Sequence, residues 1–135
     1  MFYEIGVIHN VVNDKGEEKQ KLSKFIVDKC ELFAEAEAKG LEEFAGNCDV
    51  VAIKQSKIRE FVNEPEETDE EHIYYATIID TFVNDDGSEK EVKYQVAVYA
   101  ESTTQCNKIV NEYMAQGLND MRCVAIKQTK FECVI

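Results

Sequence analysis

The chain has 135 residues, with 15 Lys and Arg against 27 Asp and Glu and a formal net charge of -12 at pH 7. This length suits one compact domain or two packed halves. The acidic balance excludes a histone-like coat for duplex DNA, because such binding depends on clustered Lys and Arg. Five cysteines without a CxxC pair exclude a disulfide framework and a zinc site. No apolar run approaches the roughly 20 residues that a bilayer requires, so we expect a soluble cytoplasmic protein.

The first half opens with two alternating stretches that predict an antiparallel hairpin. Tyr3, Ile5, Val7 and Val11 alternate with more polar partners, and apolar side chains alternate again around Phe25 and Val27. Between the two stretches, Asn13 to Gly16 reads Asn-Asp-Lys-Gly. Asn, Asp and Gly adopt the backbone conformations of tight turns, so this segment is expected to connect the two strands.

A helix and a third strand are expected next. Ala34, Ala38, Leu41 and Phe44 recur at helical spacing on one face, glutamates occupy the other, and the pattern ends near Gly46. Residues 50–57, Val-Val-Ala-Ile-Lys-Gln-Ser-Lys, then predict a strand that closes the unit.

An acidic bridge leads from this unit to a second one. It surrounds Pro65 and is interpreted as a solvated, flexible charge run; its acidic side chains are Glu64, Glu66, Glu67, Asp69, Glu70 and Glu71.

The second unit repeats the order of the first. Alternating stretches around residues 74–82 and 94–98 flank the turn from Asn84 to Gly87, and a helix is expected to start at residues 102–104 and to stop at Gly117. Residues 123–130, Cys-Val-Ala-Ile-Lys-Gln-Thr-Lys, repeat the closing strand.

This repetition predicts an α+β fold built by tandem duplication of a β-β-α-β unit. The first repeat spans residues 1–62, the acidic linker 63–72 and the second repeat 73–135, and the two repeats are expected to form one compact, pseudo-twofold symmetric domain. The strands should form antiparallel or mixed sheets with the two helices packed on one face. The closing strands could also be exchanged between the copies, because edge strands offer open hydrogen-bonding groups.

No motif in the chain identifies a reaction. His9 and His72 are the two histidines, and neither has the spacing of a metal ligand pair or a catalytic triad; glycine-rich phosphate loops are also absent. We therefore expect a protein that is not an enzyme and that uses no cofactor and no metal.

The doubled Lys-Gln-[Ser/Thr]-Lys segment is the predicted ligand site. Its ammonium, amide and hydroxyl donors suit an anionic ligand at the repeat interface, either a nucleotide or single-stranded nucleic acid, with tyrosines available to stack on bases. The predicted ligand-binding residues are Lys54, Gln55, Ser56, Lys57, Arg59, Lys127, Gln128, Thr129, Lys130, Tyr75 and Tyr99. The alternative is structural: lysines protect edge strands from aggregation, and the fold itself can require the repeated pattern.

Three short segments carry a family resemblance. Val27-Asp28, residues 34–38 (Ala-Glu-Ala-Glu-Ala) and residues 51–54 (Val-Ala-Ile-Lys) resemble an uncharacterised family of small proteins from anaerobic gut bacteria and their tailed phages. The second unit matches only through its Ala-Ile-Lys strand, and Phe33 and Ala34 replace the family's small hydroxyl residue at the helix start. The resemblance implies a phage or mobile-element protein of unknown activity in the bacterial cytoplasm, and it transfers no catalytic residue.

Two functional hypotheses follow. The first is a phage or mobile-element binding module for a nucleotide signal or single-stranded nucleic acid. The second is an acidic interaction or virion-associated component that contacts a basic protein, as a DNA mimic or a host-defence antagonist, with sheet edges that mediate homo-oligomers.

Overall fold

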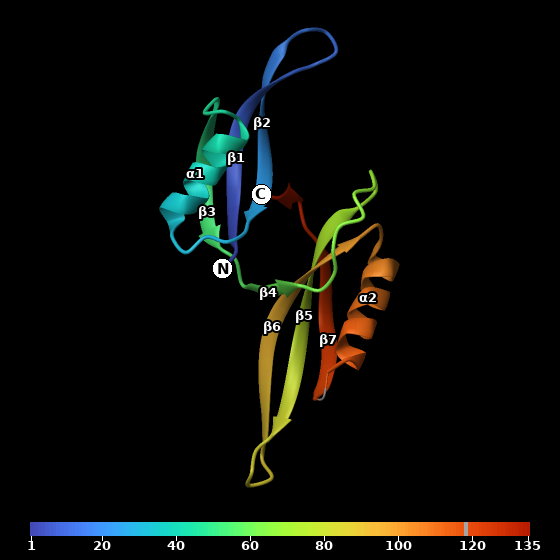
Figure 1. Ribbon diagram of the computed structural model, residues 1–135. Coiled ribbons are helices and arrows are strands. Elements are labelled where there is room, and N and C mark those ends of the chain that lie inside the picture. The colour runs from blue at the N-terminus through green and yellow to red at the C-terminus, as the bar shows by residue number, and fades with distance from the viewer. Residues whose placement is uncertain (118) are drawn as a thin grey trace. The chain divides into compact units, whose positions relative to one another are not determined.

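Eight strands and two helices follow one another along the chain (Figure 1). The structure, a computed structural model, describes residues 1–117 and 119–135. The elements are β1 (Tyr3–Val12), β2 (Glu18–Val27), α1 (Phe33–Glu43), β3 (Cys48–Gln55), β4 (Ile58–Phe61), β5 (His72–Val83), β6 (Glu89–Ala100), α2 (Thr103–Ala115), β7 (Asp120–Gln128) and β8 (Phe131–Val134).

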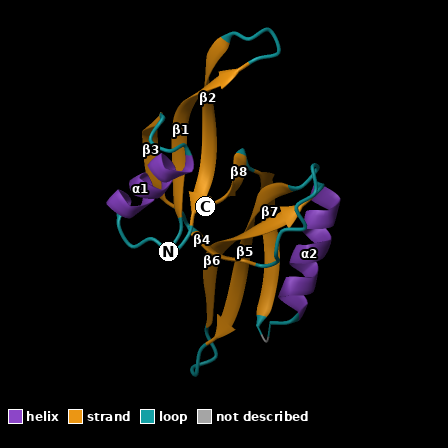
Figure 2. Cartoon of the chain, turned by 45° about the horizontal axis from the view of Figure 1, so that its top comes forward, coloured by secondary structure: helices purple, strands orange, loops and turns teal. Residues whose placement is uncertain are grey.

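The strands form two mixed four-stranded sheets, with strand orders β3-β1-β2-β8 and β4-β6-β5-β7. In each sheet three strands pair antiparallel and the short fourth strand pairs parallel. Figure 2 shows one helix beside each sheet. The α+β class and the mixed sheets are therefore confirmed.

The short strands β4 and β8 were not predicted, and each joins the sheet built from the other half of the sequence. β4 pairs with β6, and β8 pairs with β2. The chain accordingly divides into a first unit, Met1–Ser56 with Phe131–Ile135, and a second unit, Lys57–Lys130. These units differ from the predicted repeats, residues 1–62 and 73–135, because the closing segments are exchanged and the acidic linker belongs to the second unit.

Both hairpins turn where the sequence predicted. The Gly16 N–H donates to the Asn13 carbonyl at 3.0 Å, and the Gly87 N–H donates to the Asn84 carbonyl at 2.9 Å. The two glycines have φ of 78° and 86°, a left-handed conformation that side chains disfavour. The side chain of Asn13 further accepts from two backbone N–H groups of its turn.

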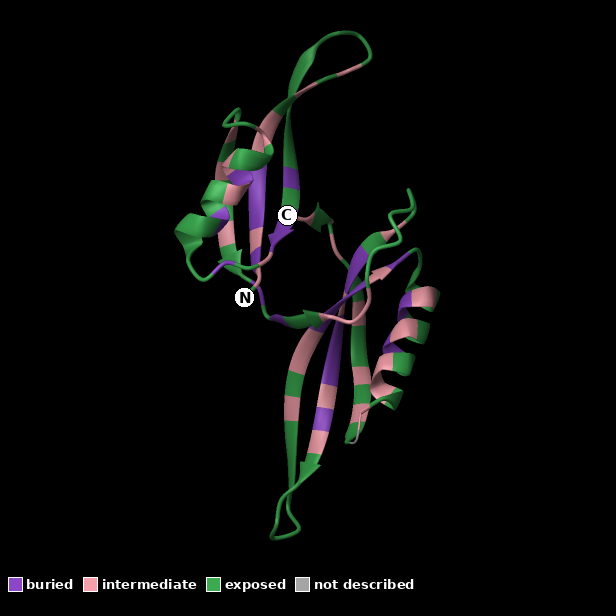
Figure 3. Cartoon of the chain, viewed as in Figure 1, coloured by how far each residue is buried: buried purple, intermediate pink, exposed green. Residues whose placement is uncertain are grey.

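The first core lies between α1 and one face of its sheet, and Figure 3 shows its buried residues along β1 and the end of β2. Ala36 and Gly40 are the buried residues of α1, whereas Ala34 and Ala38 are exposed. The predicted helix face was therefore wrong in part. A Cβ atom on Gly40 would lie only 2.8 Å from Ile5 Cδ1, so the glycine allows α1 to approach the sheet closely.

The second core is built in the same way from α2 and the β5–β6–β7 face. Cys106 and Val110 are the buried residues of α2 and pack in a cluster that includes Ile78 and Val96. The predicted start of this helix is confirmed, because the Ser102 hydroxyl caps it by accepting from the Gln105 N–H at 3.1 Å. The N-cap of α1, Leu32, offers no such bond.

Each sheet also contains a bulge in its repeated edge strand. The register of β3 against β1 shifts between Gly6 and Val7, and that of β7 against β5 shifts between Thr77 and Ile78. The extra residues are Val51 and Val124, both exposed by about half.

The acidic segment contains a hydrogen-bonded turn, and its acidic side chains are exposed, except that Glu71 is half-buried. The Glu71 carboxylate accepts from the backbone N–H of Glu66 at 2.8 Å and from that of Glu67 at 3.4 Å. Nearby, the Thr68 hydroxyl donates to Glu101 at 2.8 Å.

Candidate functional site

The repeated Lys-Gln-[Ser/Thr]-Lys segment lies where each long strand ends and the exchanged strand begins. Lys54 and Gln55 end β3, and Ser56 and Lys57 connect β3 to β4. In the same way, Lys127 and Gln128 end β7, and Thr129 and Lys130 connect β7 to β8.

Ser56 and Thr129 have a structural part in these connections. The Ser56 N–H donates to the Phe2 carbonyl at 2.9 Å, while the Thr129 N–H and hydroxyl both donate to the Ile73 carbonyl, at 2.9 and 2.7 Å. The structural interpretation of the motif therefore explains the hydroxyl of Thr129.

The predicted site residues do not all belong to one unit. Lys54, Gln55 and Ser56 lie in the first unit, whereas Lys57, Arg59, Tyr75, Tyr99, Lys127, Gln128, Thr129 and Lys130 lie in the second. Lys54 and Lys127 lie on the edge strands β3 and β7, which is also where protective lysines are expected.

Two of the predicted residues in the second unit already pack on aromatic rings. The Arg59 guanidinium lies 3.6 Å from the centre of the Tyr94 ring, and Tyr99 stacks on Phe61 with ring centres 4.9 Å apart. Tyr75 is half-buried and lies directly opposite Lys127 across the β5–β7 pair. This tyrosine and lysine are the predicted pair that the sheet does bring together.

Lys54 lines a pocket of about 350 Å³ that belongs wholly to the first unit. Its apolar lining comes from Ile5, Gly6, Leu22, Val51, Ala52 and Phe131, and its charged lining from Glu4, Lys24 and Lys54. The Cα registers Gly6–Ala52, Gly6–Lys24 and Lys24–Phe131 show that these residues come from four adjacent strands. Because the core is formed by residues such as Ile5 and Val7, which alternate with Glu4 and Gly6, the pocket lies on the face of the sheet opposite α1.

Gly6 is the unusual residue of this pocket. It lies within a ten-residue strand, where glycine is unfavourable by roughly 0.5–1 kcal/mol relative to alanine. Its φ is not in the left-handed region, and an added Cβ would meet Ala52 and Leu22 at 3.5 Å, an ordinary contact distance. Neither the backbone nor the packing therefore requires glycine here. Strand glycines of this kind mark places where a ligand or another backbone approaches closely.

The two lysines leave a positive balance at the pocket. Lys24 and Lys54 are both exposed, and neither side chain forms a hydrogen bond or ion pair with the part of the chain that the structure describes. Glu4, opposite Lys54 in the strand register, is the one acidic residue of the lining. Two ammonium groups against one carboxylate suit an anion.

Sequence reasoning found Lys54 but missed Gly6, Lys24 and Phe131. The signal for Gly6 was present as a glycine within a predicted strand, and Lys24 lies on the same face of β2 as Leu22. Phe131 could not be found, because its strand was not predicted.

A second polar constellation in the first unit joins His9, Ser23 and Glu132. The Ser23 hydroxyl donates to the Glu132 carboxylate at 3.1 Å and lies 2.7 Å from His9 Nε2, while Lys21 pairs with Glu132 at 3.3 Å. Ser23 is only 2% exposed, so its hydroxyl is closed to a substrate. The arrangement supports a structural network.

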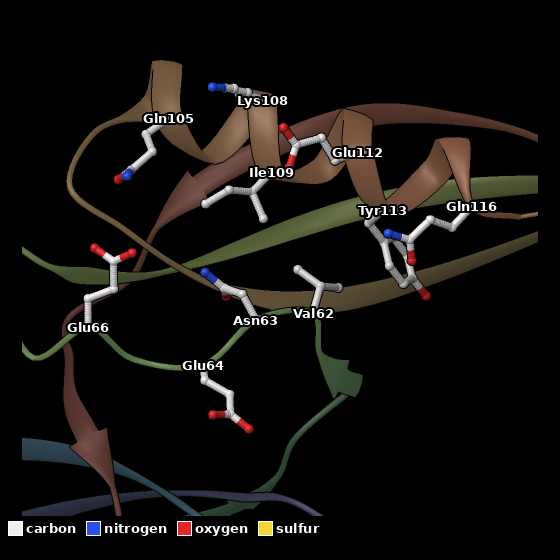
Figure 4. Close-up of a pocket in the computed structure, with 10 residues that line it drawn as sticks. All are labelled: Val62, Asn63, Glu64, Glu66, Gln105, Lys108, Ile109, Glu112, Tyr113 and Gln116. Atoms are coloured by element: carbon white, nitrogen blue, oxygen red, sulfur yellow. The ribbon is translucent and has the colours of Figure 1, made fainter.

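The second unit contains a cleft of about 370 Å³ between α2 and residues 62–66 (Figure 4). Val62 and Ile109 line it from opposite sides, and Glu66 and Glu112 contribute carboxylates. The Tyr113 hydroxyl donates to Glu60 at 2.7 Å; burial, and then this bond, raise the pKa of Tyr113 well above its ordinary value.

Over residues 1–117 and 119–135, no three His, Cys, Asp or Glu side chains are gathered as metal ligands. Neither helix in the described chain is both long and apolar enough to span a bilayer.

A family model for a domain of unknown function (DUF4494) matches residues 1–135. No curated protein and no solved structure matches the chain.

Proposed function

Because the chain belongs to the DUF4494 family, for which no function is established, we propose from its geometry that it is a non-enzymatic binding module for a small anionic ligand. The site is the pocket on the helix-free face of the first sheet. The observation that carries the proposal is the coincidence of Gly6, which the fold does not require, with two unpaired lysines on the same face.

The pocket suits a ligand with a flat or apolar part and an anionic group. Its volume of about 350 Å³ lies at the lower end for small-molecule sites, which favours a molecule the size of a mononucleotide. The apolar part would cover Gly6 and Ala52, and the anionic group would lie between Lys24 and Lys54. A nucleotide fulfils both requirements.

We infer further support for the proposal from the predicted tandem duplication. The units share the order of their elements, the Asn-x-x-Gly turn and the bulge in the edge strand. In the second sheet Thr77 occupies the place of Gly6, and Gln95 occupies the place of Lys24. We infer that the pocket is a specialisation of the first copy. A role for the chain in a phage or mobile element stays a prediction.

The proposal competes with the interpretation of Lys54 as a guard of an edge strand. Lys24 distinguishes the two in the folded sheet, because β8 pairs with β2 at this residue and covers the strand edge there. A structural role for Lys54 alone leaves Lys24 unexplained.

The test is the affinity of trinitrophenyl-AMP, measured by fluorescence titration. We expect Lys24→Gln with Lys54→Gln to weaken binding about tenfold or more, because two charge-assisted contacts are lost. The matched control is Lys19→Gln with Lys90→Gln, which removes the same charge from exposed strand positions outside the pocket and should change the affinity less than about twofold. Equal effects of the two pairs, or no binding by the unchanged protein, would contradict the proposal.

A parallel titration with oligothymidylate separates the nucleotide from single-stranded DNA. Binding that depends on Tyr75 and Lys127 instead of the pocket lysines would move the site to the second sheet.

A further inference from the structure

The cleft beside α2 in the second unit offers a site of the opposite charge. Its apolar surface is formed by Val62 and Ile109, which face one another across the opening in Figure 4. Carboxylates of Glu66 and Glu112 contribute from the two walls, while the Glu64 side chain turns away from α2. Lys108 is the one cation of the lining.

The segment that forms the lower wall is fixed to the sheet. The Asn63 amide donates to the Tyr99 carbonyl at 2.7 Å and accepts from the Tyr99 N–H at 2.9 Å, and the Val62 N–H donates to the Ala97 carbonyl at 3.0 Å. The Glu71 carboxylate holds the backbone of Glu66 from the other end. The cleft is thus shaped before any partner arrives, which lowers the entropic cost of binding.

The carboxylates of Glu66 and Glu112 have no ionic partner of their own. Neither forms a hydrogen bond or ion pair through its side chain within residues 1–117 and 119–135. An apolar floor with unpaired carboxylates at its rim matches one kind of side chain, a lysine or arginine, whose aliphatic stem is apolar and whose head is cationic.

We propose that this cleft binds a lysine- or arginine-bearing segment of a partner protein. The stem of the basic side chain lies between Val62 and Ile109, and its head reaches Glu66 and Glu112. The remaining acidic residues of the turn, among them Glu67, Asp69 and Glu70, surround the cleft with a negative field that speeds the approach of a basic partner at low salt.

The experiment uses the full chain and a fluorescein-labelled peptide of alternating Lys and Leu, with a peptide of alternating Gln and Leu as the uncharged probe. Fluorescence anisotropy at low salt should show binding of the lysine peptide and at least about tenfold weaker binding of the glutamine peptide. Equal binding of the two peptides would overturn the proposal, and so would no binding of the lysine peptide.

The location of the site is tested by variants of equal charge. Glu66→Gln with Glu112→Gln should lower the affinity for the lysine peptide about tenfold. Glu37→Gln with Glu89→Gln, at exposed positions outside the cleft, should change this affinity less than about twofold. An equal loss in both pairs would show that the net charge, and not the cleft, attracts the peptide, and the proposal would fall. Circular dichroism confirms that each variant is folded.

Discussion

Gly6 of β1 and Thr77 of β5 occupy the same place in their two sheets: each lies directly opposite an alanine of the edge strand, at the residue where the bulge begins. The Thr77 side chain fills its position and is only 8% exposed, whereas Gly6 has no side chain and lines a pocket at the corresponding position.

The first prediction concerns this difference. Gly6→Ala should raise the free energy of unfolding by about 0.5–1 kcal/mol, since it removes the entropic cost of a strand glycine without a clash. Gly6→Thr, which copies the second sheet, should weaken binding of trinitrophenyl-AMP. Urea unfolding and the fluorescence titration measure the two effects. Gly16→Ala is the control, because its φ of 78° should make the same replacement destabilising by about 1 kcal/mol.

The second prediction concerns the uncapped start of α1. Leu32 has an extended backbone, is 62% exposed and precedes Glu35 by three residues, so Leu32→Ser completes a capping box with that glutamate. We expect about 0.5–1 kcal/mol of added stability. In α2, Ser102→Ala should cost a similar amount, because the bond to the Gln105 N–H is lost. Thermal unfolding of both variants provides the measurement; a destabilised Leu32→Ser variant would count against the assigned cap.

The third prediction concerns the close approach of α1 to its sheet. Gly40→Ala gains about 1 kcal/mol of helix propensity. Its new Cβ would, however, lie 2.8 Å from Ile5 Cδ1 and 3.1 Å from Val50 Cγ2, and overpacking costs about 1–3 kcal/mol. Since Ile5 is buried, we expect a net loss of about 1 kcal/mol in urea unfolding. Ala38 is exposed, so Ala38→Gly measures the effect of helix propensity on stability without a change in packing. A stabilised Gly40→Ala variant would place the helix farther from the sheet than described.

The fourth prediction concerns alkaline pH. Burial, and then the nearby thiol of Cys123, raise the pKa of Cys106 from its ordinary value of 9.0 to about 11. Between these two values the folded state holds a proton that the unfolded state releases. The contribution of this thiol to the free energy of unfolding is therefore complete below pH 9 and is lost as pH rises through about 11. The urea midpoint should fall between pH 8 and pH 10.5, and it should fall less in Cys106→Val. An equal fall in the variant would assign the effect to other groups, such as Tyr113.

Local chemistry made much of the fold predictable. The Asn-x-x-Gly turns depend on residues within a few positions of one another, and so does the Ser102 cap, which is why the sequence located both. The prediction for α1 was wrong in part because it placed Ala34 and Ala38 on the buried face together with the larger apolar residues Leu41 and Phe44. The residues that α1 buries against its sheet are instead Ala36 and Gly40.

What escaped prediction depends on partners far along the chain. β4 and β8 have four residues each, too few for a pattern, and they become strands only by pairing with a sheet from the other half of the sequence. The pocket escaped for the same reason. Gly6 can be assigned to a pocket only when the strand pairing shows that Ala52 and Lys24 lie on either side of it.

The exchange of β4 and β8 has a consequence for synthesis on the ribosome. Chains emerge from the amino end, and domains formed by the first residues usually fold first. Here the outer strand of the first sheet comes from residues 131–134, after every residue of the second unit has been made. The first unit therefore begins to emerge before the second unit and is completed after it, and until then β2 presents an open edge in the nascent chain.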